Sequence, residues 1–169
     1  MIYPFKGKTP KIDASVFIAD GAKIIGDVEI GEFSSIWFNA VVRGDVNYIR
    51  IGKRTNIQDC SVLHVTRRLH PLIVGDDITI GHNVTLHACV VKDRCLIGMG
   101  AVVMDAVEVG EDSIIGAGSL VTGGTIIPPR SMVLGSPAKV KRSLTDAEVL
   151  RIKKSAENYI EDILNYRNS

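Results

Sequence analysis

Aromatic side chains are scarce in this chain of 169 residues, at 5% of the sequence, with a single tryptophan. No apolar run approaches the roughly 18 residues of a membrane-spanning helix, and the first residues lack the apolar stretch of a signal peptide. The cysteines number three and form no CxxC pair, so a disulfide framework is not expected. These absences predict a cytoplasmic chain without a membrane partner.

Net charge is small as well, because 20 Lys and Arg face 19 Asp and Glu, which gives +1. Nucleic-acid-binding proteins usually carry a strongly basic patch, so no nucleic-acid partner is expected. Hydrophobic residues make up 46% of the chain, too many for a disordered protein. A chain of this length can bury one core, so we expect a single domain.

Aliphatic residues recur at every sixth position along most of the chain. The register shifts at three steps, with three extra residues in 42–51, five extra in 63–74 and one fewer in 86–91. We expect the two insertions to bud outward as loops. Glycine often follows the repeated residue, and a small residue usually stands four positions after it. The repeated positions are Ile12, Ile18, Ile24, Ile30, Ile36, Val42, Ile51, Ile57, Leu63, Val74, Ile80, Leu86, Val91, Ile97, Val103, Val109, Ile115, Val121, Ile127 and Val133.

This period is typical of a solenoid with three flat faces per coil. The aliphatic residue fills the axis, the small residue fits the corner and glycine allows a tight turn. Three hexapeptides form one coil, and successive coils stack as parallel strands about 4.8 Å apart. We therefore predict an all-β solenoid over residues 12–140, preceded by an N-terminal arm of residues 1–11. A β-sandwich of short strands is the alternative, which a strict sixfold period disfavours.

The C-terminal segment changes to a helical pattern. Thr145 and Glu148 form the signature of a capping box, and apolar residues follow at helical spacing. The pattern predicts one amphipathic helix over residues 145–167. We expect it to pack against the solenoid or against a neighbouring subunit.

Counting coils along the repeat places three histidines on the outer surface. Arg43, His64 and His87 each directly follow an axial residue of the same face, so they should form a ladder. His64 and His87 then lie on adjacent coils, close enough to share a metal ion. Asp59 and His82 stack in the same way on the preceding face, around a corner. We therefore expect His82 to reach the metal ion of a neighbouring subunit.

Three solenoids packed side by side would give three such sites, each with two histidines from one chain and one from the next. Three imidazoles with one open position form a catalytic zinc arrangement, and iron or cobalt would also fit. The alternative is that these are surface or interface histidines without a metal. His70 lies in the second insertion, and we expect it to be a bystander or a gate.

At these residues the chain resembles the gamma-class carbonic anhydrase family, in its hexapeptide transferase-like subgroup. The resemblance covers nearly the whole chain and rests on residues 43–45, 56–59, 63–64, 81–87 and 135–139. It implies a left-handed parallel β-helix and a homotrimer with zinc between the subunits. The implied reaction is the reversible hydration of CO2 to bicarbonate by a metal-bound hydroxide. It also implies that His64 and His87 come from one subunit and His82 from its neighbour.

The resemblance suggests roles for the residues around the metal. Gln58 would hold the hydroxide by a hydrogen bond, Asn56 would orient CO2 or the product, and Tyr159 of the C-terminal helix would reach the site. An inter-subunit ion network that orients the site is expected of three charged residues, Arg43, Asp45 and Asp59.

The chain departs from the best-studied members in their acidic loop, whose glutamate carries protons out of the site. No glutamate follows Asp45 here, and residues 67–70 are Arg-Arg-Leu-His. A slow or inactive enzyme is therefore expected, unless buffer or His70 carries the proton. Three other functions stay open: ester or thioester hydrolysis at the same metal, metal-free acyl transfer by a histidine base, and a non-catalytic trimeric binding role.

Overall fold

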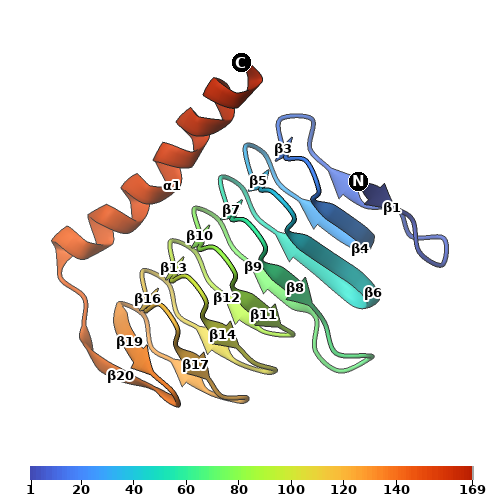
Figure 1. Ribbon diagram of the computed structural model, residues 1–169. Helices are drawn as coiled ribbons and strands as arrows, with labels where there is room; N and C mark the ends of the chain where they lie inside the picture. The colour runs from blue at the N-terminus through green and yellow to red at the C-terminus, as the bar shows by residue number, and fades with distance from the viewer. Residues whose placement is uncertain (169) are drawn as a thin grey trace.

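The protein is a parallel β-solenoid of about seven turns with one long helix at its C-terminal end (Figure 1). A computed structural model describes residues 1–168. Strands of successive coils pair in parallel on three faces, and the last two strands pair in antiparallel fashion. The structure confirms the predicted solenoid.

The first face, called the histidine face, contains β8 (Val62–His64), β11 (Thr85–His87), β14 (Val102–Val103) and β17 (Leu120–Val121). The second, the helix face, contains β3 (Phe17–Ile18), β5 (Ser35–Ile36), β7 (Asn56–Ile57), β10 (Thr79–Ile80), β13 (Leu96–Ile97), β16 (Ile114–Ile115), β19 (Ser131–Gly135) and β20 (Ala138–Ser143). The third contains β2 (Lys11–Ile12), β9 (Leu72–Val74), β12 (Val90–Val91), β15 (Glu108–Val109) and β18 (Ile126–Ile127).

Two longer strands, β4 (Lys23–Ile30) and β6 (Val41–Ile51), run from the histidine face onto the third face. β1 (Ile2–Tyr3) pairs with the start of β4, so the N-terminal arm also adds a strand to the first coil.

The repeated aliphatic residues fill the axis, as the period predicts. From Ile24 to Val133 each is at most 4% exposed, and Ile12 and Ile18 pack partly buried against the same core. Each fully buried side chain of this size stabilises the fold by about 1.5–3 kcal/mol. The coil count is also confirmed, because Leu86 lies opposite Leu63 in the pairing of β11 with β8.

The two insertions differ in form. The prediction of a loop within 42–51 is wrong: β6 continues through the insertion, and its register against β4 shifts between Gly26 and Val28. The extra residues form a bulge because β4 pairs with both ends of β6 and keeps the chain extended. Residues 66–71 do leave the coil as a loop, in which the Thr66 N–H donates to the His70 carbonyl at 3.1 Å.

The C-terminal helix α1 (Asp146–Arg167) begins at the predicted capping box. The Thr145 hydroxyl accepts from the Glu148 N–H, and the Glu148 carboxylate accepts from the Thr145 N–H at 2.9 Å. Val149 and Ile152 are buried against side chains of β13, β16 and β19, so the helix packs on its own solenoid (Figure 1). None of the helices that the structure describes is long and apolar enough to cross a membrane.

Candidate metal centre

His64 and His87 lie side by side on the histidine face, as the coil count predicts. They are direct partners in the pairing of β8 with β11. His64 Nδ1 and His87 Nε2 are 3.1 Å apart. Two imidazole nitrogens bound at 2.0–2.1 Å to a tetrahedral zinc ion would be separated by about 3.3 Å. The pair is therefore spaced nearly as two ligands of one metal ion would be.

The other nitrogen of each ring faces a carboxylate. His64 Nε2 lies 3.1 Å from Asp45 Oδ1, and His87 Nδ1 lies 2.5 Å from Asp105 Oδ1. An ionised carboxylate only accepts, so each of these two nitrogens carries a ring hydrogen, and when both rings are neutral the two facing nitrogens carry the lone pairs. Two lone pairs at 3.1 Å repel each other unless a cation lies between them. The donor set therefore fits a metal ion.

Burial favours the neutral, metal-binding form of His64. It lowers the pKa of His64 below its ordinary value, even though the hydrogen bond to Asp45 acts in the opposite direction. Asp45 in turn accepts from the Arg43 guanidinium at 2.6 Å. Burial alone would raise the pKa of Asp45, but the hydrogen bonds from Arg43 and His64 lower it. Arg43, Asp45 and His64 thus form one network within a single chain, and an inter-subunit part stays a prediction.

His82 lies around a corner from this pair, beyond the end of β10. Its Nδ1 is 2.7 Å from Asp59 Oδ2, and Asp59 Oδ1 also accepts the Phe38 N–H at 3.2 Å. The imidazole side chain is 48% exposed. Within residues 1–168, no three His, Cys, Asp or Glu side chains gather closely enough to hold a metal ion. A site with three histidines therefore requires a second chain.

Gln58 and Asn56 lie in a buried chain of hydrogen bonds that leads to the helix. Gln58 Nε2 donates to Asn56 Oδ1 at 3.1 Å. Asn56 Nδ2 donates to Thr79 Oγ1 at 3.0 Å, and that hydroxyl is 3.0 Å from Ser155 Oγ of α1. Asn56 is only 1% exposed, so its contacts fit a residue that positions Gln58. Its contact with CO2 stays a prediction.

Tyr159 lies on α1, which packs on the helix face, and His82 follows β10 of that face. Its ring meets Trp37 edge-on, with centroids 5.4 Å apart. Burial raises the pKa of Tyr159, and the charges of Asp162 and Asp59 raise it further. Asp59 is also the partner of His82, so Tyr159 lies near the carboxylate that orients that imidazole. A contact between Tyr159 and the metal site stays a prediction.

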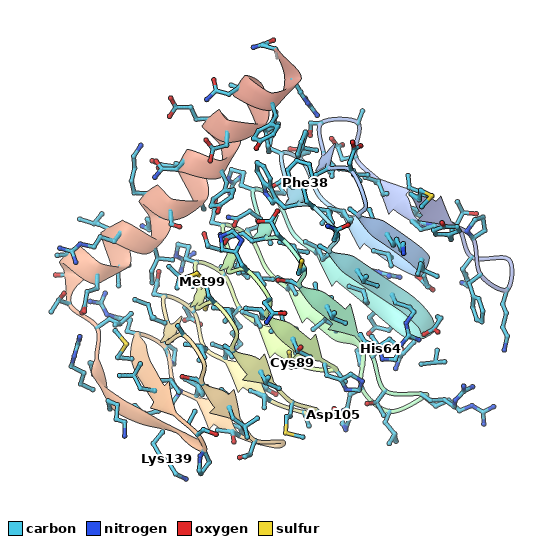
Figure 2. The ribbon with its side chains drawn as sticks, in the orientation of Figure 1. Phe38, His64, Cys89, Met99, Asp105 and Lys139 are labelled. Atoms are coloured by element: carbon cyan, nitrogen blue, oxygen red, sulfur yellow. The ribbon has the colours of Figure 1, made fainter. Side chains whose placement is uncertain are left out.

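Sequence reasoning missed Asp105. The residue lies with His64 on the side of the solenoid away from α1 (Figure 2). Its position could have been inferred, because Val103 stacks on Leu86 and Asp105 therefore lies one residue beyond the neighbour of His87. His70, by contrast, is exposed in its loop, and its role as a gate stays a prediction.

Comparisons with known proteins agree with this architecture. Residues 88–123 match the bacterial transferase hexapeptide family (six repeats). The chain is 53% identical over 161 residues to a carbonic anhydrase of Geobacillus kaustophilus, covering 95% of this chain and 88% of that protein. It is 46% identical over 158 residues to the mitochondrial gamma carbonic anhydrase 2 of Arabidopsis thaliana, covering 90% of this chain but 57% of that protein.

Among solved structures, a candidate acetyltransferase of Bacillus cereus superimposes with a TM-score of 0.97 at 49% identity. The match covers 99% of this chain and 97% of that one. Hexapeptide-repeat proteins of this kind are left-handed β-helices. Identities of this size over nearly the whole chain show that the protein belongs to the gamma-class carbonic anhydrase family of left-handed parallel β-helices.

Proposed function

We propose that this protein catalyses the reversible hydration of CO2 to bicarbonate and a proton, with zinc held between the subunits of a homotrimer. The observation that carries the proposal is the facing pair of His64 and His87, whose Nδ1 and Nε2 atoms are 3.1 Å apart. The names of the carbonic anhydrase relatives support the reaction.

The residues present fit zinc better than a catalytic base. Each of the three outward histidines is bound to a carboxylate through one nitrogen, which fixes the tautomer and leaves the other nitrogen for a metal. A single histidine base would need only one histidine–carboxylate pair, and it would not need a second imidazole facing the first. When bound, zinc supplies a Lewis acid that activates water for addition to CO2 near neutral pH.

The third ligand would be His82 of the neighbouring chain, oriented by Asp59 of that same chain. Gln58 follows the same strand as Asp59 and would approach the site with it. Its bond to Asn56 commits one amide hydrogen and fixes the direction of the amide, which suits a side chain that holds the attacking water or the product by a hydrogen bond.

Proton release would depend on buffer, because this chain lacks the acidic loop of the best-studied members. Residues 67–70 are exposed and contain two arginines and His70 in its place. We expect the rate of CO2 hydration to rise with the concentration of an imidazole buffer.

The test is stopped-flow CO2 hydration on metal-analysed protein, loaded with zinc or, without oxygen, with Fe²⁺. His82→Ala is the matched variant, because His82 is half exposed and its loss leaves the solenoid core intact. Metal-dependent activity that disappears in this variant would support the proposal. Full metal occupancy without activity would contradict it and direct the search to thioester substrates.

A further inference from the structure

The Asp105 carboxylate lies between a histidine of the candidate metal centre and the loop of residues 66–71. Its Oδ1 is 2.5 Å from His87 Nδ1. Its Oδ2 accepts a hydrogen bond from the Thr66 hydroxyl. Both carboxylate oxygens therefore have a hydrogen-bond partner: Oδ1 contacts His87 of the histidine face, and Oδ2 contacts Thr66, the first residue of the loop.

The turn at this corner does not itself need a carboxylate. Asp105 stands two residues after the axial Val103, and the same slot holds Val65, Ala88 and Gly123 in other coils. The chain turns the corner directly after Ala88 and Gly123, whereas after Val65 it first leaves the coil as the loop of residues 66–71. What distinguishes Asp105 is therefore its pair of side-chain contacts rather than the backbone geometry.

Thr66 is itself held on several sides. Its carbonyl accepts from Asn47 Nδ2 at 3.2 Å, its N–H donates to the His70 carbonyl at 3.1 Å and its hydroxyl donates to Asp105. A residue held in this way is a firm anchor for the carboxylate. Thr66 thereby links both insertions of the repeat, within 42–51 and 63–74, to the carboxylate that contacts His87.

We propose that Asp105 is a positioning residue that fixes the Nδ1–H tautomer and the ring orientation of His87, and that Thr66 holds Asp105 in place. The metal-binding part rests on the proposed function. The ring hydrogen on Nδ1 leaves the Nε2 lone pair directed at His64, which is the arrangement a shared metal ion requires. The loop of residues 66–71 is then coupled to the metal ligand, so a change of loop conformation alters metal affinity.

The first test needs no metal. Long-range ¹H–¹⁵N spectra of the histidine rings in metal-free protein report which nitrogen of His87 carries hydrogen. We expect Nδ1–H in the wild type and a fall in its population in Asp105→Ala. Thr66→Val, which loses only the hydroxyl donor, should shift it in the same direction, and Thr66→Ser should not. An unchanged His87 tautomer in Asp105→Ala would overturn the proposal.

The second test is zinc affinity, measured by competition with a chelator at fixed pH. Asp105→Ala should bind zinc about 10–100-fold more weakly, as for other carboxylates that hold a metal-binding histidine. Asp20→Asn is the matched control, because Asp20 is an exposed aspartate two residues after the axial Ile18. Wild-type affinity in Asp105→Ala would contradict the proposal.

The two tests also separate this inference from the proposed function. Zinc binding that depends on Asp105, in a protein that does not hydrate CO2, would support the positioning role and refute the proposed reaction. If the wild type binds no zinc, the proposed metal centre fails, and the tautomer of His87 alone decides whether Asp105 positions the ring.

Discussion

The close stacking of the coils predicts a large cost for one added methyl group at Gly98. This glycine follows the axial Ile97 at a corner of the helix face. A Cβ atom at Gly98 would lie 2.5 Å from the backbone N of Ala117 and 2.8 Å from the carbonyl carbon of Gly116. Ordinary contacts of a carbon atom begin at about 3.4 Å, so the adjacent coils would have to move apart by nearly 1 Å.

The expected cost of Gly98→Ala can be built from two contributions. Overpacking of a rigid interior costs about 1–3 kcal/mol of unfolding free energy. Separation of the coils also weakens the hydrogen bond from the Gly98 N–H to the Ile115 carbonyl, now 2.7 Å, which is worth about 1 kcal/mol. A total of about 3 kcal/mol corresponds to a fall in Tm of about 6–12 °C for a chain of this size.

Gly118→Ala is the matched control. Gly118 has a φ of +65°, and no atom lies within 4 Å of where its Cβ would be. The substitution should therefore cost only the backbone strain of a positive φ, about 1 kcal/mol. Thermal denaturation followed by circular dichroism, at one protein concentration, compares the two variants. If Gly118→Ala lowers Tm as much as Gly98→Ala does, the reasoning from coil stacking is refuted.

Three further predictions concern the helix cap, an ion pair and the candidate site. Thr145→Ala should lower the unfolding free energy by about 1 kcal/mol and Thr145→Ser by much less, as measured by urea denaturation, because serine keeps the capping oxygen. Burial alone would raise the pKa of Asp27, but the hydrogen bond and the charge of Arg50 bring it below its ordinary 3.8. The Asp27–Arg50 ion pair therefore stabilises the fold above pH 3.8, and this stabilisation is lost as the pH falls through the folded-state pKa of Asp27. Arg50→Gln should therefore reduce the difference in unfolding free energy between pH 7 and pH 3; an undiminished difference would show that this pair is not its source. Gln58→Ala should lower kcat for CO2 hydration by about tenfold or more with zinc content unchanged; an unaltered rate at full occupancy would contradict the role proposed for Gln58.

The fold was accessible from the sequence because a solenoid repeats one local rule. The sixfold period identified the axial residues, and counting coils placed His64 beside His87 without knowledge of any contact. The capping box located the start of the helix to the residue. These features depend on periodicity and local chemistry, which a single sequence carries.

Other features depended on contacts that the period does not report. The insertion at 42–51 adds three residues in either case, and only the pairing of β6 with β4 decides between a bulge and a loop. The support of His87 depends on Asp105 and Thr66, which are 39 residues apart in the chain. Their approach requires Thr66, at the start of the loop of residues 66–71, to reach past the coil of His87 to the coil after it, and no spacing rule predicts that.

The most direct test of the central claim is the mixing of two variants that are each expected to lack a complete site. His64→Ala removes a ligand from one side of the proposed subunit interface, and His82→Ala removes the ligand from the other side. Both proteins are unfolded, mixed in equal amounts and refolded together, and zinc content and CO2 hydration are then measured.

If each site takes His64 and His87 from one chain and His82 from the next, the mixture regains about a quarter of the wild-type sites, because one ordered pair of neighbours in four carries all three histidines. Each variant refolded alone should stay without function. A mixture that binds no more zinc than the two variants alone, while wild-type protein treated in the same way recovers its sites, would contradict a metal centre shared between chains.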